Sequence, residues 1–338
     1  MSTRTVAPST IVAMPPRVAA SGLVIAVASA LAFSFSGPFL KPLLEAGWSL
    51  GAVLLVRMGL AGLVLSPALL WALRRERGFV RRHGGIIVAF GLTAVAGCQL
   101  FYFAAMQRMP VAVALLIQYF APVLLVIWVW ARSRRAPSRL VVAGSLVAMA
   151  GLVLVVDLTG ARFDLLGTLF ALGAATCTAV YFAIAERSGD RLPPLALASG
   201  GLLIGTALIG VLLLTGILPF AAPAVSVVLA GVEVPWWMPL VWVGAIGTSL
   251  GYALGVMAVP RIGARVASFV GLSEVLFTLV MAWIFLGEAP APVQFAGGAL
   301  ILVGVVLVRM DATPRVRVVA AAADRRRRGV RLRRGPTP

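Results

Sequence analysis

Two ionisable side chains lie inside strongly apolar stretches of this sequence. Glu274 is part of GLSEVLFTLVMAWIFL, and Arg57 is part of LLVRMGLAG. If these stretches span a membrane, an ionised side chain at their centre costs roughly 2.5–3.5 kcal/mol, so it usually faces a protein interior or a watery cavity. Glu274 is therefore predicted to face a cavity; the alternative is a structural role, paired with Arg57 or a backbone group. Arg57 has three open interpretations: bidentate binding of a carboxylate, pairing with Glu274, or extension to the membrane surface.

Five further polar side chains in apolar stretches are candidates for the same site: Gln99, Tyr102, Gln118, Tyr119 and Tyr252. Gln99 and Tyr102 are three residues apart, which places them on one helix face. A small-molecule site needs a few convergent polar groups within apolar walls. Together the five residues indicate such a site, although each one alone fits interhelical packing as well.

The residue types of this sequence give little support for a catalytic function. The single histidine, His83, lies in the basic stretch RRERGFVRRH, and Cys98 and Cys177 lack metal-type spacing. An integral-membrane enzyme generally needs a nucleophile with a base, or metal ligands. The only lysine, Lys41, precedes Pro42, so no GxxxxGK[ST] phosphate-binding loop exists in the sequence. We expect no catalytic residue, no metal and no cofactor.

The composition identifies the elements that must position these residues. The chain has 338 residues, of which 61% are hydrophobic and 12% charged, and its mean hydropathy is +1.03. In soluble domains about a quarter of the residues are charged. The low share of charged residues here therefore predicts an all-α integral membrane protein. Ten segments approach the roughly 20 apolar residues of a membrane span: 18–40, 51–73, 85–106, 111–131, 140–156, 165–185, 195–217, 236–259, 266–285 and 293–308.

The basic residues indicate how these segments are oriented. The net charge is +18, and most of the 29 basic residues fall in the two ends and in alternate loops such as RRERGFVRRH and ARSRRAPSR. Basic loops remain on the cytoplasmic side. We therefore expect an even number of helices, a cytoplasmic segment at residues 1–17, and a disordered basic tail at residues 310–338. Fixing topology is favoured for this tail over binding anionic lipid or nucleic acid, so no nucleic-acid partner is expected.

The chain also repeats itself at an offset of 153 residues. The offset aligns identical residues across three segments: Arg108 with Arg261, Trp130 with Trp283, Pro137 with Pro290, Gly144 with Gly297, and Gly151 with Gly304. The repeat unit has five helices, an odd number, so its second copy enters the membrane in the opposite direction. We predict two inverted repeats, at residues 18–156 and 165–309, which is the usual construction of secondary transporters.

Two parts of the sequence carry a family resemblance. SEVLFTLVMAWIFLGEAPAPVQFAGGALILVGVVLV has an acid, an apolar helix, LGE, a proline and a glycine-containing last helix, while AFSFSGPFLKPLLEAG and LLVRMGLAG match helices one and two. On these residues the chain resembles EamA-type members of the drug/metabolite transporter superfamily over nearly all of residues 18–309. It departs where the family often has Trp, Gly and a polar residue, here Phe33 to Phe35, and where Glu274 would be followed by proline. The resemblance therefore selects no substrate.

The resemblance implies a ten-helix carrier that exports small organic metabolites, such as amino acids, or toxic compounds. Without a phosphate-binding loop, uphill transport needs an ion gradient or a partner ATPase. Protons are favoured, since an acid in a low dielectric can hold and release a proton. Such a carrier would be a multi-pass protein of a bacterial-type plasma membrane, with lipid and a small solute as partners; homodimer formation is left open. Multidrug efflux, a passive channel, a membrane enzyme and a scaffold are the alternatives.

Overall fold

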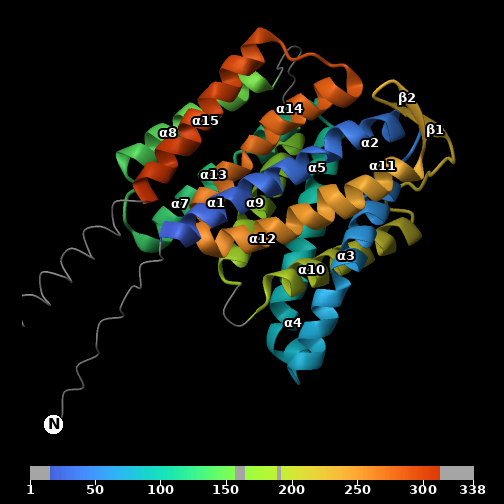
Figure 1. The fold of residues 1–338 in the computed structure, drawn as a ribbon, viewed down its shortest axis with the longest axis horizontal. Helices are drawn as coiled ribbons and strands as arrows, with labels where there is room; N and C mark the ends of the chain where they lie inside the picture. The colour runs from blue at the N-terminus through green and yellow to red at the C-terminus, as the bar shows by residue number, and fades with distance from the viewer. Residues whose placement is uncertain (1–15, 157–163, 189–191, 313–338) are drawn as a thin grey trace, which may run out of the picture.

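The computed structural model describes residues 16–156, 164–188 and 192–312. Most of the predicted N-terminal segment and nearly all of the basic tail lie outside these residues. The described chain is a bundle of helices with one small hairpin (Figure 1). Its first half contains α1 (Pro16–Ser34), α2 (Ser36–Glu45), α3 (Leu50–Arg75), α4 (Phe79–Ala89), η1 (Phe90–Gly97), α5 (Cys98–Met106), α6 (Val111–Gln118), α7 (Ala121–Ser133) and α8 (Arg139–Val155). Its second half contains α9 (Leu165–Glu186), α10 (Pro194–Leu214), β1 (Ser226–Leu229), β2 (Val232–Pro235), α11 (Trp237–Trp242), η2 (Val243–Leu250), α12 (Gly251–Ile262), α13 (Ala264–Gly271), α14 (Ser273–Leu286) and α15 (Pro292–Ala312).

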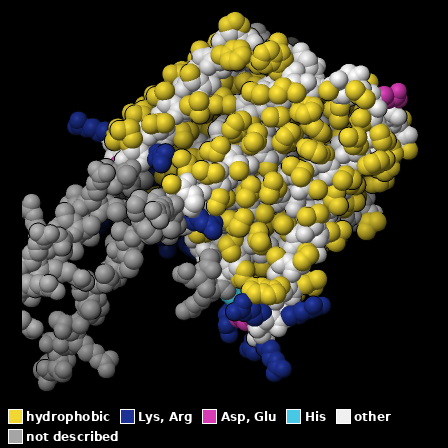
Figure 2. All heavy atoms as spheres, viewed as in Figure 1, with side chains coloured by type: hydrophobic (Ala, Val, Ile, Leu, Met, Phe, Trp, Pro, Cys, Tyr) yellow, Lys and Arg dark blue, Asp and Glu magenta, His cyan; other side chains and the backbone are white. Residues whose placement is uncertain are grey.

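Nine helical stretches of the described chain are long and apolar enough to cross a membrane. They correspond to nine of the ten predicted segments. The remaining segment, 140–156, forms α8, which has 17 residues and is shorter than the others. The visible face of the molecule is covered with hydrophobic side chains, while arginines gather along its left and lower edges (Figure 2). The chain is therefore a multi-pass membrane protein.

Three of the spans consist of two helices separated by a short break. The breaks lie at Phe35, at Tyr119–Phe120 and at Leu272. Proline follows the first two breaks: Pro38 lies in the first turn of α2, and Pro122 in the first turn of α7. Proline lacks a backbone N–H and fits the start of a helix. The break at Leu272 has no such proline, yet it lies 153 residues after Tyr119.

Two π-helical segments repeat at the same offset. η1 covers Phe90–Gly97 and η2 covers Val243–Leu250, so their first residues are 153 positions apart. Each continues directly into an α-helix, α5 or α12. A π-helical turn widens the helix locally and is frequent at functional sites. The local geometry thus repeats in the same register as the sequence.

Helices α8 and α15, the last of each predicted repeat, cross through pairs of glycines and lie side by side in Figure 1. A Cβ atom on Gly144 would be 2.8 Å from the Gly304 carbonyl oxygen, and one on Gly151 would be 2.5 Å from that of Gly297. These distances leave room only for glycine. Because Gly297 and Gly304 are the offset partners of Gly144 and Gly151, each helix meets the other in reversed order. The two helices therefore run antiparallel.

A β-hairpin departs from the all-helical expectation. β1 pairs with β2 antiparallel, with Leu229 opposite Val232, and the turn residues Ala230 and Gly231 have φ values of 51° and 76°. Positive φ at both positions is typical of the two-residue turns that match strand twist. The Ala230 N–H donates to the Phe285 carbonyl at 2.8 Å, which ties the hairpin to the end of α14. The stretch SVVLAGVEVP lies between two expected membrane spans, and the sequence predicts no hairpin there.

Candidate functional site

A cavity of about 900 Å³ lies within the bundle, and it is lined by residues from both halves of the chain. All seven predicted site residues line it: Arg57, Gln99, Tyr102, Gln118, Tyr119, Tyr252 and Glu274. They come from α3, α5, α6, α12, α14 and the break after α6. Sequence reasoning thus selected residues that the fold brings together in one place.

Glu274 owes its position to the break at Leu272. It is the second residue of α14, so its carboxyl group lies in the first turn of a helix. The positive end of the helix dipole favours a negative charge there. The carboxyl group interacts with the Tyr119 hydroxyl and with the charge of Arg57. Two broken spans therefore meet at this acid, one supplying Glu274 and the other Tyr119.

Arg57 lines the same cavity from the N-terminal third of α3. Its Nε atom is buried and has no hydrogen-bond partner. None of the ion pairs among the described residues includes Arg57, so the proposed direct pairing with Glu274 is not formed in this structure. The guanidinium group is thus available to an anionic group of a bound solute.

All four tyrosines of the chain line this cavity. Sequence reasoning named three of them and missed Tyr181, which lies on α9. The Tyr181 ring packs edge-on against Tyr252, with 5.9 Å between centroids, and against Phe182 at 4.9 Å. Its hydroxyl is buried without a hydrogen-bond partner, and it lies so close to Gly255 that a Cβ there would be 2.2 Å away. A tyrosine within an apolar span was the signal that could have identified it.

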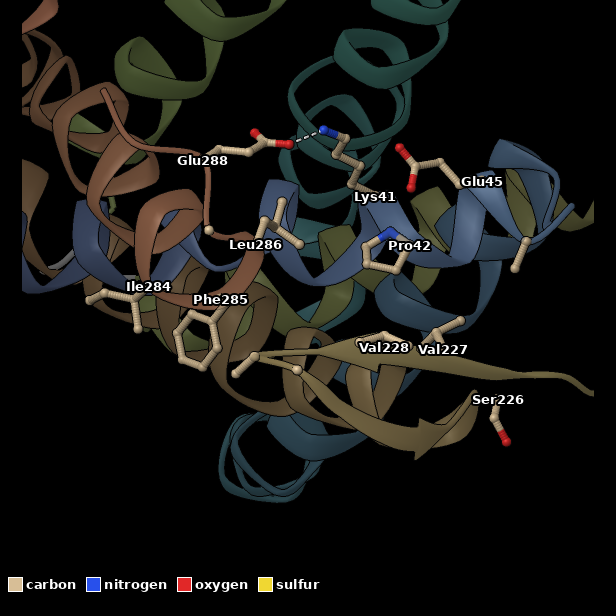
Figure 3. A pocket seen from close by; sticks show the side chains of 14 residues that line it. Lys41, Pro42, Glu45, Ser226, Val227, Val228, Ile284, Phe285, Leu286 and Glu288 are labelled. Carbon is tan, nitrogen blue, oxygen red and sulfur yellow. Dashed lines mark hydrogen bonds and ion pairs between the residues drawn. The ribbon is translucent and has the colours of Figure 1, made fainter. Parts of the chain in front are cut away.

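One end of the cavity reaches a group of charged residues. Lys41 and Glu45 of α2 and Glu288, just after α14, all line the cavity. Lys41 forms an ion pair with Glu288, and both side chains are about half exposed, at 48% and 51%. Gly287 has a φ of 72° and ends α14 in the left-handed conformation, which turns the chain so that Glu288 points to Lys41 (Figure 3). Glu288 thus links the end of α14 to α2.

A second hollow of about 750 Å³ lies beside this charged group. Its lining includes Lys41, Glu45 and Glu288, residues of the hairpin, and the end of α14. Figure 3 shows Phe285 and Ile284 on one side of it and Val227 and Val228 on the other. The central cavity and this hollow share Lys41, Glu45, Leu286 and Glu288. The charged group therefore marks the mouth of the central cavity.

The opposite end of the bundle is tightly packed. The lining of the cavity stops at Ala26 on α1 and at Val259 on α12. Beyond it, a Cβ on Gly22 would lie 2.7 Å from the side chains of Arg261 and Ile262. Glu186 accepts a hydrogen bond of 3.0 Å from the Ala264 N–H, which caps α13 from α9. Among the described residues, the cavity thus approaches one surface of the membrane protein and not the other.

Within the described part of the chain, no group of three or more His, Cys, Asp or Glu side chains is placed to hold a metal ion. The polar side chains that line the cavity include four tyrosines, two glutamines, the Arg57 guanidinium and the Glu274 carboxyl group, with Lys41, Glu45 and Glu288 at its mouth. Such a lining suits hydrogen bonding and charge recognition of a small polar molecule.

Comparison with known proteins decides the family. The model of the EamA-like transporter family matches residues 20–157 and 165–310, which together are most of the chain. The chain belongs to this family. EamA-type proteins are part of the drug/metabolite transporter superfamily, so the protein is a membrane transporter of small molecules. The family model thus matches the chain twice, once in each half.

Several relatives and solved structures resemble this EamA-type protein. The threonine/homoserine exporter RhtA of Escherichia coli K12 is 27% identical over 237 residues, covering 68% of this chain and 72% of RhtA. The uncharacterized transporter YwfM of Bacillus subtilis is 25% identical over 245 residues, covering 70% of this chain and 77% of YwfM. A crystal structure matches with a TM-score of 0.67 at 21% identity, over 87% of this chain and 99% of the other. This structural match shows the fold alone.

Proposed function

We propose that this protein is a secondary transporter that exports a small organic metabolite, such as an amino acid, and that it is driven by protons. The observation that carries the proposal is the placement of the Glu274 carboxyl group and the Arg57 guanidinium group in a single cavity that has a mouth at one end. An amino acid has an ammonium and a carboxylate group, and these two side chains have complementary charges. The RhtA relatives are threonine and homoserine exporters, which supports this class of solute.

Arg57 is the proposed binding group for a carboxylate. Its Nε–H has no partner in the protein, and a guanidinium group can hold both oxygens of a carboxylate at once. A bound carboxylate would satisfy this donor and balance the buried charge. The tyrosines and glutamines of the lining would then orient the rest of the solute.

Glu274 is the proposed proton carrier. It faces the cavity from the first turn of α14 and has no ion pair with Arg57 in the described part of the chain. An acid in a low dielectric holds a proton until a counter-charge or water stabilises its ionised form. Arrival of a cationic ammonium group supplies such a counter-charge, so solute binding and proton release would be coupled at one residue.

Alternating access would arise from two inverted five-helix halves that make up ten spans, with α8 as the fifth. The repeated π segments, the matching breaks after Gln118 and Gly271, and the antiparallel glycine crossing of α8 with α15 support this arrangement. The arginine-rich edges would face the cytoplasm, together with both chain ends, which places the Lys41–Glu288 mouth outside. On this orientation the structure is open toward the outside.

Efflux of toxic, more apolar compounds is the second candidate. It is favoured by the aromatic lining, in which all four tyrosines and Phe33 and Phe182 contribute rings. Such compounds would depend on ring contacts rather than on the charge of Arg57. The two candidates therefore differ in whether removal of that charge abolishes transport.

The test compares the extracellular metabolites of cells that overproduce the native protein, Glu274→Gln, or Glu45→Gln. Glu45 is the matched control because it is an exposed acid at the mouth. We expect an amino acid or a similar small solute to accumulate outside with the native protein and with Glu45→Gln, and at least tenfold less with Glu274→Gln. Equal export by all three proteins would contradict the role of Glu274, and an unchanged medium with the native protein would contradict export.

A further inference from the structure

Gln118, Cys98 and Thr178 form a chain of hydrogen bonds along one wall of the cavity. Gln118 Nε2 donates to Cys98 Sγ at 3.4 Å, and Cys98 Sγ lies 3.3 Å from Thr178 Oγ1. Thr178 Oγ1 in turn donates to the Ala174 carbonyl oxygen at 3.0 Å. The three side chains all line the cavity. They were not linked by sequence reasoning, which named only Gln118.

The available protons fix the direction of this chain. The single hydroxyl proton of Thr178 points to Ala174, so the Thr178 oxygen must accept from the Cys98 thiol. The thiol proton is thereby used, and the Cys98 sulfur can act toward Gln118 only as an acceptor. The amide nitrogen of Gln118 must therefore face Cys98, which turns its carbonyl oxygen the other way.

The Gln118 carbonyl oxygen is consequently left without a partner. Its Oε1 atom is buried and makes no hydrogen bond within the described protein. A buried polar atom of this kind costs about 1–3 kcal/mol and calls for an explanation, since such groups are nearly always satisfied. Gln118 lines the cavity, where a bound molecule could supply the missing donor.

Three elements hold this acceptor in place. Gln118 is the last residue of α6, immediately before the break of that span, while Cys98 is the first residue of α5 after η1, and Thr178 lies on α9. The residue next to Gln118 is Tyr119, which interacts with Glu274. The unpartnered oxygen is therefore one residue away from the contact of the proposed proton carrier.

We propose that Gln118 Oε1 accepts a hydrogen bond from the transported solute, and that Cys98 and Thr178 are positioning residues that keep this acceptor facing the cavity. The inference rests on the proposed transport function. It assigns the solute a donor group, either an ammonium N–H or a hydroxyl O–H. Solutes without such a donor leave the oxygen unsatisfied and are selected against.

The hydrogen-bond chain can be tested without transport. In the purified full-length Cys177→Ser protein, Cys98 is the only thiol, and its S–H stretching band in the infrared reports whether the thiol donates a hydrogen bond. We expect Thr178→Val to shift this band to higher wavenumber, because the acceptor is gone, while Thr178→Ser keeps the native position. A band that is unchanged in Thr178→Val would overturn the arrangement.

Transport kinetics then test the role of this hydrogen-bond chain. The probes are L-threonine and L-valine, and transport is measured in proteoliposomes. We expect Gln118→Leu and Cys98→Ala to raise KM for L-threonine about tenfold, the fold-change of one lost hydrogen bond, with kcat within about twofold of native. Cys98→Ser, which can still accept and donate, is expected to stay near the native KM. Equal KM values for Cys98→Ala and Cys98→Ser, or an effect on kcat alone, would overturn the proposal.

The two probes also separate the two donor groups. Both amino acids carry an ammonium group, but only L-threonine has a hydroxyl in place of a methyl group. A loss confined to L-threonine identifies the hydroxyl as the donor, and an equal loss for both identifies the ammonium group. If the native protein transports neither probe, the amino-acid proposal fails. The solute found by the export comparison then replaces the two probes, and the same KM criterion applies to it. The infrared test of the hydrogen-bond chain does not depend on this result.

Discussion

The two halves of this transporter share several backbone features and differ in their chemistry. The π segments, the breaks after Gln118 and Gly271, and the glycines of α8 and α15 recur at the offset of 153 residues. The individual side chains that could act on a solute do not recur, and even Gln99 and Tyr252, which occupy offset positions in the cavity lining, are different residue types. The residues at the offset positions of Glu274 and Cys98 are Ala121 and Gly251.

This difference separates two requirements of a carrier. A backbone that can move in two equivalent ways benefits from being duplicated, whereas a solute site needs its charges once, at a defined place. Tyr102 and its offset partner Gly255 illustrate this, because the second position must be small to accommodate Tyr181.

The largest effect is expected from closing the space between α8 and α15. In Gly151→Val the Cβ would lie 2.5 Å from the Gly297 carbonyl oxygen, a backbone atom that cannot turn away. We expect destabilisation of about 3 kcal/mol or more and little monodisperse protein in detergent, measured by size-exclusion yield and thermal melting. Gly85→Val is the matched control, since a Cβ at Gly85 meets nothing within 4 Å. Equal melting of the two variants would contradict the crossing.

Moving the acid to the other half tests whether the chemistry is truly asymmetric. Ala121, the offset partner of Glu274, is only 1% exposed, so a carboxyl group there would be buried in packed side chains and not presented to the cavity. We expect Glu274→Ala combined with Ala121→Glu to transport at least tenfold less than native, and no better than Glu274→Ala alone. Solute flux per amount of membrane protein measures this. Recovery of half the native flux would show that the two positions are equivalent.

Arg57→Lys tests the binding of a carboxylate at the single guanidinium of the cavity. A lysine keeps the charge but loses the planar, two-point geometry. We expect KM to rise about tenfold, with kcat less affected, and Arg57→Gln to abolish measurable binding. Arg108→Lys serves as the control, because Arg108 is exposed and does not line the cavity. Native KM values in Arg57→Gln would exclude carboxylate recognition and favour the efflux of apolar compounds.

The smallest effect is expected at the mouth. Lys41 and Glu288 are both about half exposed, and ion pairs between exposed side chains contribute about 1 kcal/mol or less. We expect Lys41→Gln to change the transport rate by no more than about fivefold and the melting temperature by a few degrees. The exchanged pair Lys41→Glu with Glu288→Lys should restore the native rate. A complete loss in Lys41→Gln that the exchange does not restore would place Lys41 in the transport chemistry itself.

Much of the architecture could be predicted because long apolar runs identify the membrane spans and arginine-rich loops indicate their orientation. The repeat was visible for the same reason, since Trp, Arg and Pro at one offset are unlikely matches among Leu, Val and Ala. Glu274 and Arg57 stood out as charges in an apolar setting. The hairpin at residues 226–235 and the break at Leu272 could not be predicted, because neither short strands nor a proline-free break leaves a clear signal in an apolar sequence.

The missed site residues have a related cause. Tyr181, Cys98 and Thr178 lie on helices that are apolar on every side, so polarity does not indicate which face meets the cavity. Only the packing of α5, α6 and α9 brings them to one wall. Gln118 was identified as a polar residue, but the orientation of its amide depends on partners 20 and 60 positions away in the chain.

The most direct test of the central claim is solute counterflow in proteoliposomes without any ion gradient. Vesicles with the native protein are loaded with the unlabelled solute found by the export comparison, and uptake of a trace of the labelled solute is followed. If the protein is a carrier with one alternating site, the label accumulates transiently above its equilibrium level. This accumulation occurs because the site returns across the membrane while it is occupied by solute. Uptake that rises only to equilibrium, with no transient excess, would contradict alternating access and indicate a passive pathway.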